Sequence, residues 1–188
     1  MKKLIGALSV ALLAVTLSAS LASCSKCEHK SDRDNNGICD ECSEILNEVT
    51  KDVWDFEFSV TNAAVTILET TESSGNTEGV KQELSVVSGK VYPASGDESS
   101  PGWGMDFSAL QPYFAFGASF ESFVYDEKTA KYTCDEITVN EITYENVSVT
   151  FNTSKRLSSI DYSVQSSERI NVSIKISNHG GAAVPEKQ

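Results

Sequence analysis

Apolar and polar residues alternate along the last third of the chain. Three stretches, 147–151, 160–164 and 170–176, place Val, Ile, Phe or Tyr at every second position and Ser, Thr, Asn, Asp or Lys between them. Successive side chains of a strand point to opposite faces, so this period of two is typical of half-buried strands. The pattern predicts a three-stranded antiparallel meander with one face packed and the other in water.

The same alternation, in shorter pieces, occurs upstream. Val65 and Ile67 indicate one strand, and the apolar positions of 80–86 indicate the next, with a Ser/Gly/Asn turn at 73–76 between them. A turn at 88–90 leads into a short strand at 91–92. Two further strands are expected at 120–125 and 131–137, joined through 126–129.

Two short helices are expected beside these strands. Thr50 can cap a helix with Asp52 in its first turn, and the side expected to be buried carries Val53, Trp54, Phe56 and Phe58. Asp106 can cap a single turn that Pro112 would end. The predicted fold class is α+β, mainly β: a curved antiparallel sheet with one or two short helices on its apolar face.

Aromatic residues are concentrated in the segment that follows Asp106. Five of its apolar residues are candidates for lining a pocket that holds an apolar ligand: Phe107, Leu110, Phe114, Phe116 and Phe120. The alternative is that these rings only close one side of the core, because packed aromatic side chains are the usual case. A binding surface and a core wall therefore both remain open for this segment.

The N-terminus has the pattern of a secretory leader. Lys2 and Lys3 precede an apolar run from Leu4 to Leu17, which is short for a membrane span. The next residues, Leu21-Ala22-Ser23-Cys24, resemble the lipobox of bacterial lipoproteins. That resemblance implies cleavage before Cys24, lipid attachment to its thiol, and a protein held on the extracytoplasmic face of the cell membrane. The alternative is an ordinary leader cut at a small-residue site.

Charge restricts the partners of the mature chain. The full chain has 15 basic and 27 acidic residues, and loss of a leader containing Lys2 and Lys3 leaves 13 and 27, a net charge of −14. Nucleic acid is therefore not an expected partner, because binding to it needs clustered positive charge. An acidic surface also repels anionic headgroups, so the lipid on Cys24 would be what holds the protein to the membrane.

The segment 24–43 after the leader offers a zinc site. Three thiols and one imidazole, the donor set that a structural Zn²⁺ prefers, come from Cys27, His29, Cys39 and Cys42. The last two form a Cys-x-x-Cys turn.

A calcium loop overlaps the same segment. Positions one, three, five, seven and nine of such a loop would be Asp32, Asp34, Asn36, Ile38 and Asp40, and Gly37 would supply the sharp turn. The pattern resembles the calcium loops of thrombospondin type 3 repeats and of the excalibur family. It departs from them at position twelve, where Ser43 replaces the acid. Two simpler interpretations remain open, a disulfide among the cysteines and a turn-rich linker without an ion.

The expected organisation is a leader over 1–23, a Cys/His/Asp module over 24–43 and a β-rich domain over 44–188. The small module and the stretch 120–185 resemble parts of uncharacterised surface lipoproteins of Gram-positive anaerobic bacteria. No functional residue of the main domain follows from that resemblance.

Catalytic motifs are not evident in the sequence. Neither a Gly-x-Ser-x-Gly elbow, nor a phosphate-binding loop, nor a His-Glu-x-x-His motif occurs in the chain, and its two histidines are His29 and His179. Three hypotheses follow: a membrane-tethered binding or carrier module for an apolar ligand, an envelope scaffold that binds a protein, and a hydrolase with paired carboxylates. The first is favoured, and the protein is not expected to be an enzyme.

Overall fold

The structure is a computed structural model that describes residues 39–40, 45–73, 76–100 and 102–186. The first part consists of α1 (Lys51–Phe58), β1 (Asn62–Ser73), β2 (Asn76–Val87), β3 (Lys90–Pro93) and β4 (Met105–Asp106). A run of short helices follows, η2 (Phe107–Leu110), α2 (Gln111–Phe114), η3 (Ala115–Ala118) and η4 (Phe120–Ser122). The last part comprises β5 (Val124–Asp126), β6 (Lys131–Val139), β7 (Ile142–Phe151), β8 (Leu157–Gln165) and β9 (Arg169–Ser177).

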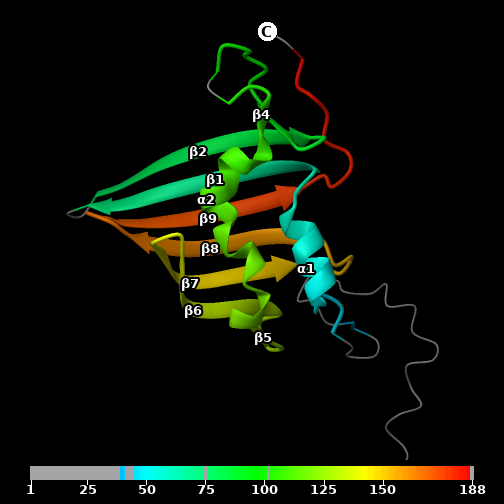
Figure 1. The fold of residues 1–188 in the computed structure, drawn as a ribbon, viewed down its shortest axis with the longest axis vertical. Coiled ribbons are helices and arrows are strands. Elements are labelled where there is room, and N and C mark those ends of the chain that lie inside the picture. The colour runs from blue at the N-terminus through cyan, green and yellow to red at the C-terminus, as the bar shows by residue number, and fades with distance from the viewer. Residues whose placement is uncertain (1–38, 41–44, 74–75, 101, 187–188) are drawn as a thin grey trace, which may run out of the picture.

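All nine strands belong to one open antiparallel sheet, in the order β4-β3-β2-β1-β9-β8-β7-β6-β5 (Figure 1). The predicted meander at the C-terminus is confirmed as β7, β8 and β9, and the predicted pair 64–67 and 80–86 is confirmed as the hairpin of β1 and β2. The mainly β fold class with short helices on the apolar face is therefore confirmed.

The sheet consists of two meanders that meet in its middle. Strands β1 to β4 form one and β5 to β9 form the other, and β1 pairs with β9 from Ala64↔Ser177 to Glu72↔Arg169. The first and last long strands are therefore neighbours.

The helices lie over one face of this sheet and enclose the aromatic core (Figure 1). Trp54 of α1 is fully buried at its centre. Five rings lie with their centroids 4.7–5.6 Å from that of Trp54, namely those of Phe58, Phe120, Phe123, Tyr132 and Phe151. The indole Nε1 donates a hydrogen bond to the carbonyl oxygen of Gly117 at 2.6 Å, which ties α1 to the run of short helices.

Several local predictions were wrong. Phe56 was expected inside, yet it is 66% exposed, and Glu57 takes the buried position beside it. Pro112 does not end the helical turn after Asp106; it lies in the first turn of α2, where its missing N–H costs nothing. The strand expected from Phe120 begins only at Val124, because residues 120–122 form a 3₁₀ turn.

The segment 45–49, which precedes α1, is hydrogen-bonded to the strands of the domain. Its Asn47 side chain donates to the carbonyl oxygens of Ala130 and Phe151 at 2.9 and 3.1 Å. Val49 exchanges two hydrogen bonds with the Tyr132 hydroxyl, at 2.7 and 2.9 Å. None of the described helices is long and apolar enough to cross a membrane.

Candidate functional site: the uncovered face of the sheet

The face of the sheet opposite the helices is polar. In β1, the buried positions Ala63, Val65 and Ile67 alternate with Thr66 and Leu68, which remain accessible. The same alternation in β8 and β9 brings short polar side chains and one lysine to this face: Ser159, Asp161, Ser163, Asn171, Ser173 and Lys175. No described helix lies over these residues, and we call this surface the uncovered face.

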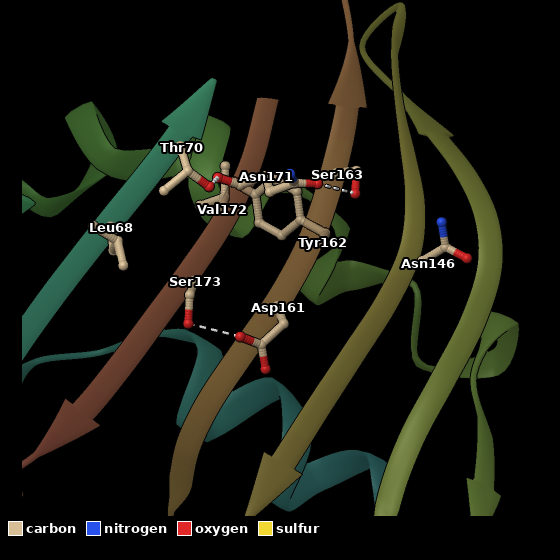
Figure 2. A pocket seen from close by; sticks show the side chains of 9 residues that line it. All are labelled: Leu68, Thr70, Asn146, Asp161, Tyr162, Ser163, Asn171, Val172 and Ser173. Carbon is tan, nitrogen blue, oxygen red and sulfur yellow. Dashed lines mark hydrogen bonds between the residues drawn. The ribbon is translucent and has the colours of Figure 1, made fainter. Parts of the chain in front are cut away.

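A β-bulge in β7 opens a hollow in the uncovered face. The pairing of β7 with β8 shifts register between Glu145 and Ser148, and Asn146 at the shift has a left-handed φ of 52°. An extra residue in one strand bends it and spreads the neighbouring side chains. The hollow has a volume of about 260 Å³. Figure 2 shows its lining, which is Leu68, Thr70, Asn146, Asp161, Tyr162, Ser163, Asn171, Val172 and Ser173.

Hydrogen bonds across β8 and β9 fix the floor of the hollow. Ser173 donates its hydroxyl to Oδ1 of Asp161 at 2.7 Å, and Ser163 donates to Oδ1 of Asn171 at 2.8 Å (Figure 2). Arg169 donates to the Ser163 hydroxyl at 3.1 Å and lies 3.5 Å from a carboxylate oxygen of Glu145. The side chains of Tyr162 and Val172 are buried on the opposite face, so these two residues line the hollow through their backbone.

The five apolar ligand candidates lie on the helical side of the sheet. Phe116 is fully buried against Phe58, Phe123, Tyr144 and Tyr162, and Phe120 packs on Trp54. The other three border shallow surface hollows. Phe107 and Phe114 line one of about 280 Å³ beside Gln111. Leu110 lines a more apolar one of about 210 Å³ with Leu84, Val91 and Met105. The helical segment therefore forms the core wall and borders two small hollows.

Partly buried phenols on the helical side serve as hydrogen-bond donors. Burial, together with the hydrogen bond that its hydroxyl donates to Oε1 of Glu69 at 2.7 Å, raises the pKa of Tyr113 to about 12. Burial likewise raises the pKa of Tyr125 to about 12, and its hydroxyl bonds Oδ1 of Asn47 at 2.5 Å. These phenols are neutral at physiological pH, so each keeps the proton that it donates to Glu69 or Asn47.

The predicted metal ligands fall almost entirely outside the described residues. Only Cys39, which is buried, and Asp40, which is exposed, are described. Cys24, Cys27, His29, Asp32, Asp34, Asn36, Ile38 and Cys42 are not. Among the described residues no group of three or more His, Cys, Asp or Glu is placed to hold a metal ion. The structure thus lends no support to a separate Cys/His module, and zinc and calcium remain predictions.

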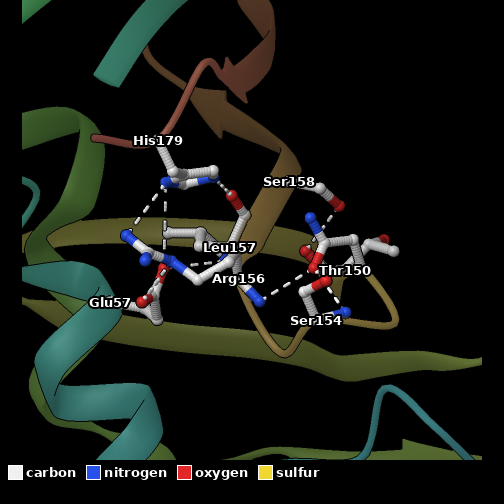
Figure 3. Close-up of polar contacts among 8 residues, drawn as sticks. Glu57, Thr150, Ser154, Arg156, Leu157, Ser158 and His179 are labelled. Carbon is white, nitrogen blue, oxygen red and sulfur yellow. Dashed lines mark hydrogen bonds and ion pairs between the residues drawn. The ribbon is translucent and has the colours of Figure 1, made fainter. Parts of the chain in front are cut away.

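A buried polar cluster that sequence reasoning missed joins α1 to the C-terminal segment (Figure 3). Glu57, with a side chain only 3% exposed, lies 2.8 Å from Nε of Arg156 and accepts a hydrogen bond from the backbone N–H of Leu157 at 3.0 Å. The ring Nε2 of His179 is 2.8 Å from the carbonyl oxygen of Leu157, so Nε2 carries the proton. Nδ1 of His179 faces Nη2 of Arg156 at 3.4 Å.

This cluster fastens the segment after β9. Asn62 supports the same segment, because its side chain accepts from the N–H of Ala182 at 2.9 Å and its carbonyl oxygen accepts from Gly180 at 3.0 Å. A buried charge is retained only when it is paired and hydrogen-bonded, and Glu57 meets both conditions. We assign the cluster a structural role.

The chain matches no known family model, and it has no recognisable match among curated proteins. The candidate site therefore rests on its own geometry.

Proposed function

We propose that this protein is a lipid-anchored, extracytoplasmic binding module without catalytic activity, and that the uncovered face of its sheet is the contact surface. The supporting observation is the contrast between the faces. The helical face is filled by a packed aromatic core, and the hollows bordered by its helices are lined largely by apolar side chains, whereas the uncovered face carries a hollow of about 260 Å³ lined mainly by polar side chains. The lipobox-like sequence before Cys24 supports the anchor.

The geometry of the hollow favours binding over hydrolysis. Asp161 is the single carboxylate among the described residues that line it. Hydrolysis by a carboxylate pair needs two such groups flanking the scissile bond. A binding site needs only fixed donors and acceptors, which the cross-strand hydrogen bonds of this floor supply.

A second candidate function is a carrier for an apolar ligand. The observation that favours it is the small hollow lined by Leu84, Val91, Met105 and Leu110, next to the helical segment. Its volume of about 210 Å³ is below the about 300 Å³ at which sites for drug-sized ligands begin, so it would hold only part of a lipid chain.

Hydroxyl-radical footprinting of the full chain in intact cell envelopes distinguishes these functions. Each surface carries an exposed, oxidisable probe: Leu68, 40% exposed, reports on the uncovered face, and Met105, 46% exposed, reports on the apolar hollow. Phe56 of α1 serves as the reference because it borders neither of these two hollows. We expect Leu68 to be oxidised more slowly in envelopes than in the purified protein, relative to Phe56.

Protection of Met105 alone would favour the carrier, and unchanged oxidation of Leu68 would contradict the proposal. The anchor has its own test. Metabolic labelling with a fatty acid should mark the wild type and not Cys24→Ala, and equal labelling of both would show that Cys24 is not the attachment site.

A further inference from the structure

We infer that the hollow at the β7 bulge binds a neutral, hydroxyl-rich ligand, that is, a saccharide unit. This inference rests on the proposed use of the uncovered face and adds the chemical class of the ligand. Its evidence is the hydrogen-bonding capacity left over at the rim of the hollow, the charge around it and its size.

Two polar groups at the rim have unused hydrogen-bonding capacity within the described structure. Asp161 uses Oδ1 to accept from Ser173, and no described residue bonds its Oδ2. The amide of Asn146 bonds no described residue either, and the bulge holds it exposed on the neighbouring strand (Figure 2). A carboxylate oxygen accepts from hydroxyl groups, while a primary amide both donates and accepts. Together they suit a ligand whose adjacent hydroxyl groups are both donors and acceptors.

The charges argue against an anionic ligand. Two cations border the hollow with their own partners: Arg169 is occupied by Glu145 and Ser163, and Lys81, opposite Leu68 in β2, is occupied by Glu83. Lys175 lies farther out, two positions from Ser173 on the same face. Asp161 itself carries a negative charge within the lining, and the whole chain has a net charge of −12. An anion in the hollow would therefore lie against the Asp161 carboxylate, which repels it.

A metal ion is also a poor fit to this lining. Calcium takes six to eight oxygen ligands, usually with several carboxylates among them. The hollow offers one carboxylate, and Ser163 and Asn171 are engaged with each other.

Size and shape agree with a small sugar. The volume of about 260 Å³ lies just under the about 300 Å³ at which sites for drug-sized ligands begin, which suits one or two sugar rings. Leu68, 40% exposed, gives the hollow an apolar border on which the C–H face of a ring can lie. The remaining lining consists of hydroxyl and amide groups, the Asp161 carboxylate and backbone.

Ligand-observed saturation-transfer NMR tests the inference with the full chain in a zwitterionic detergent that carries no sugar headgroup. The neutral probes are cellobiose, maltose and diacetylchitobiose, and the charged probe is glucuronic acid. We expect transfer to at least one neutral disaccharide, at the weak affinity typical of shallow sites. Glucuronic acid should not bind more tightly than that disaccharide.

Two variants locate the binding. Asp161→Asn keeps an acceptor for Ser173 but loses the carboxylate, and Asn146→Gly removes the amide while allowing the left-handed φ of 52°. Each should weaken the affinity about tenfold, as expected for one hydrogen bond to a charged group or two neutral ones. Glu83→Gln is the matched control, since it removes one negative charge from β2 on the same face; its affinity should stay within twofold of the wild type.

The inference is overturned if no neutral disaccharide binds the folded wild type, if the charged probe binds better, or if both rim variants bind as the wild type does. Footprinting in envelopes separates this failure from failure of the proposed function. Protection of Leu68 without saccharide binding would leave the uncovered face as a contact surface for another class of partner. Absence of both results would remove the proposed function as well.

Discussion

The same strands form both faces of the sheet, but one face is apolar and packed and the other is polar and accessible. On the helical face, residues such as Val65, Ile160 and Ile174 are buried, and the central rings of Trp54 and Phe116 each contact several others. On the uncovered face, Ser side chains bond Asn and Asp side chains across strands, and a hollow lies where β7 bulges. The comparison indicates that stability is concentrated on one face, which leaves the other free to carry a site.

The largest expected effect is at the centre of the helical face. Trp54→Ala removes the ring that five others surround and leaves a cavity, so the free energy of unfolding should fall by about 3–5 kcal/mol. Chemical denaturation monitored by circular dichroism measures it. Phe56→Ala on the same helix is the control, because that ring is 66% exposed, and it should change stability by only about 0.5 kcal/mol or less. Equal losses for both variants would contradict the assignment of the buried side.

The next effect concerns the cluster that closes the edge of the helical face. Glu57→Gln weakens the pairing with Arg156 while keeping an acceptor for Leu157, and should cost about 1–3 kcal/mol. Asp55→Asn, which breaks an exposed pair with Lys51, should cost about 0.5 kcal/mol or less.

Hydrogen exchange gives an independent reading of the same change. In Glu57→Gln, the amides of Gly180 and Ala182 should exchange faster, because the segment they fix loses its anchor. Unchanged exchange there would mean that Asn62 alone holds the C-terminal segment.

The stability of the helical face should decrease at alkaline pH, where Tyr113 ionises. The pKa of Tyr113 is raised to about 12 from an ordinary value of 10.0, so the phenol ionises earlier in the unfolded chain than in the folded one. Its contribution to stability is complete below pH 10 and is lost as the pH rises to about 12. Melting temperatures measured across this range should fall less steeply for Tyr113→Phe. An identical slope would mean that Tyr113 is not protected from ionisation.

The smallest effect is expected on the uncovered face. Ser159→Ala on β8 and Ser85→Ala on β2 remove hydroxyl groups that water can replace, so each should change the free energy of unfolding by about 0.5 kcal/mol or less. Chemical denaturation of these variants and of Trp54→Ala compares the loss of unfolding free energy on the two faces. A loss of several kcal/mol at either serine would show that the uncovered face contributes to stability as the helical face does.

The strands could be predicted because their signal is local. Alternation along 147–151, 160–164 and 170–176 is enough to define a meander and its apolar face. The pairing of β1 with β9 could not be predicted in this way, since it joins residues about a hundred positions apart and many pairings satisfy the same pattern.

The hollow corresponds to a signal in the sequence, which is a change in the phase of the alternation rather than the alternation itself. Tyr144 is buried, and the next buried residue is Val147, so the phase of the alternation changes at Glu145-Asn146. Asn tolerates a left-handed backbone, which makes such a phase change a usable sign of a bulge. The burial of Glu57 and His179 left no comparable trace, because their partner Arg156 reaches them only in the folded chain.

The position of β9 between β1 and β8 has a consequence for the order in which the protein folds. The hairpin of β1 and β2 can form early, but it joins the rest of the sheet only when the last strand of the chain is present. Contacts across such sequence separations close slowly. On the proposed route of export, with the N-terminus leading, the sheet stays incomplete until the C-terminal residues have crossed, so the topology itself delays folding until delivery is finished.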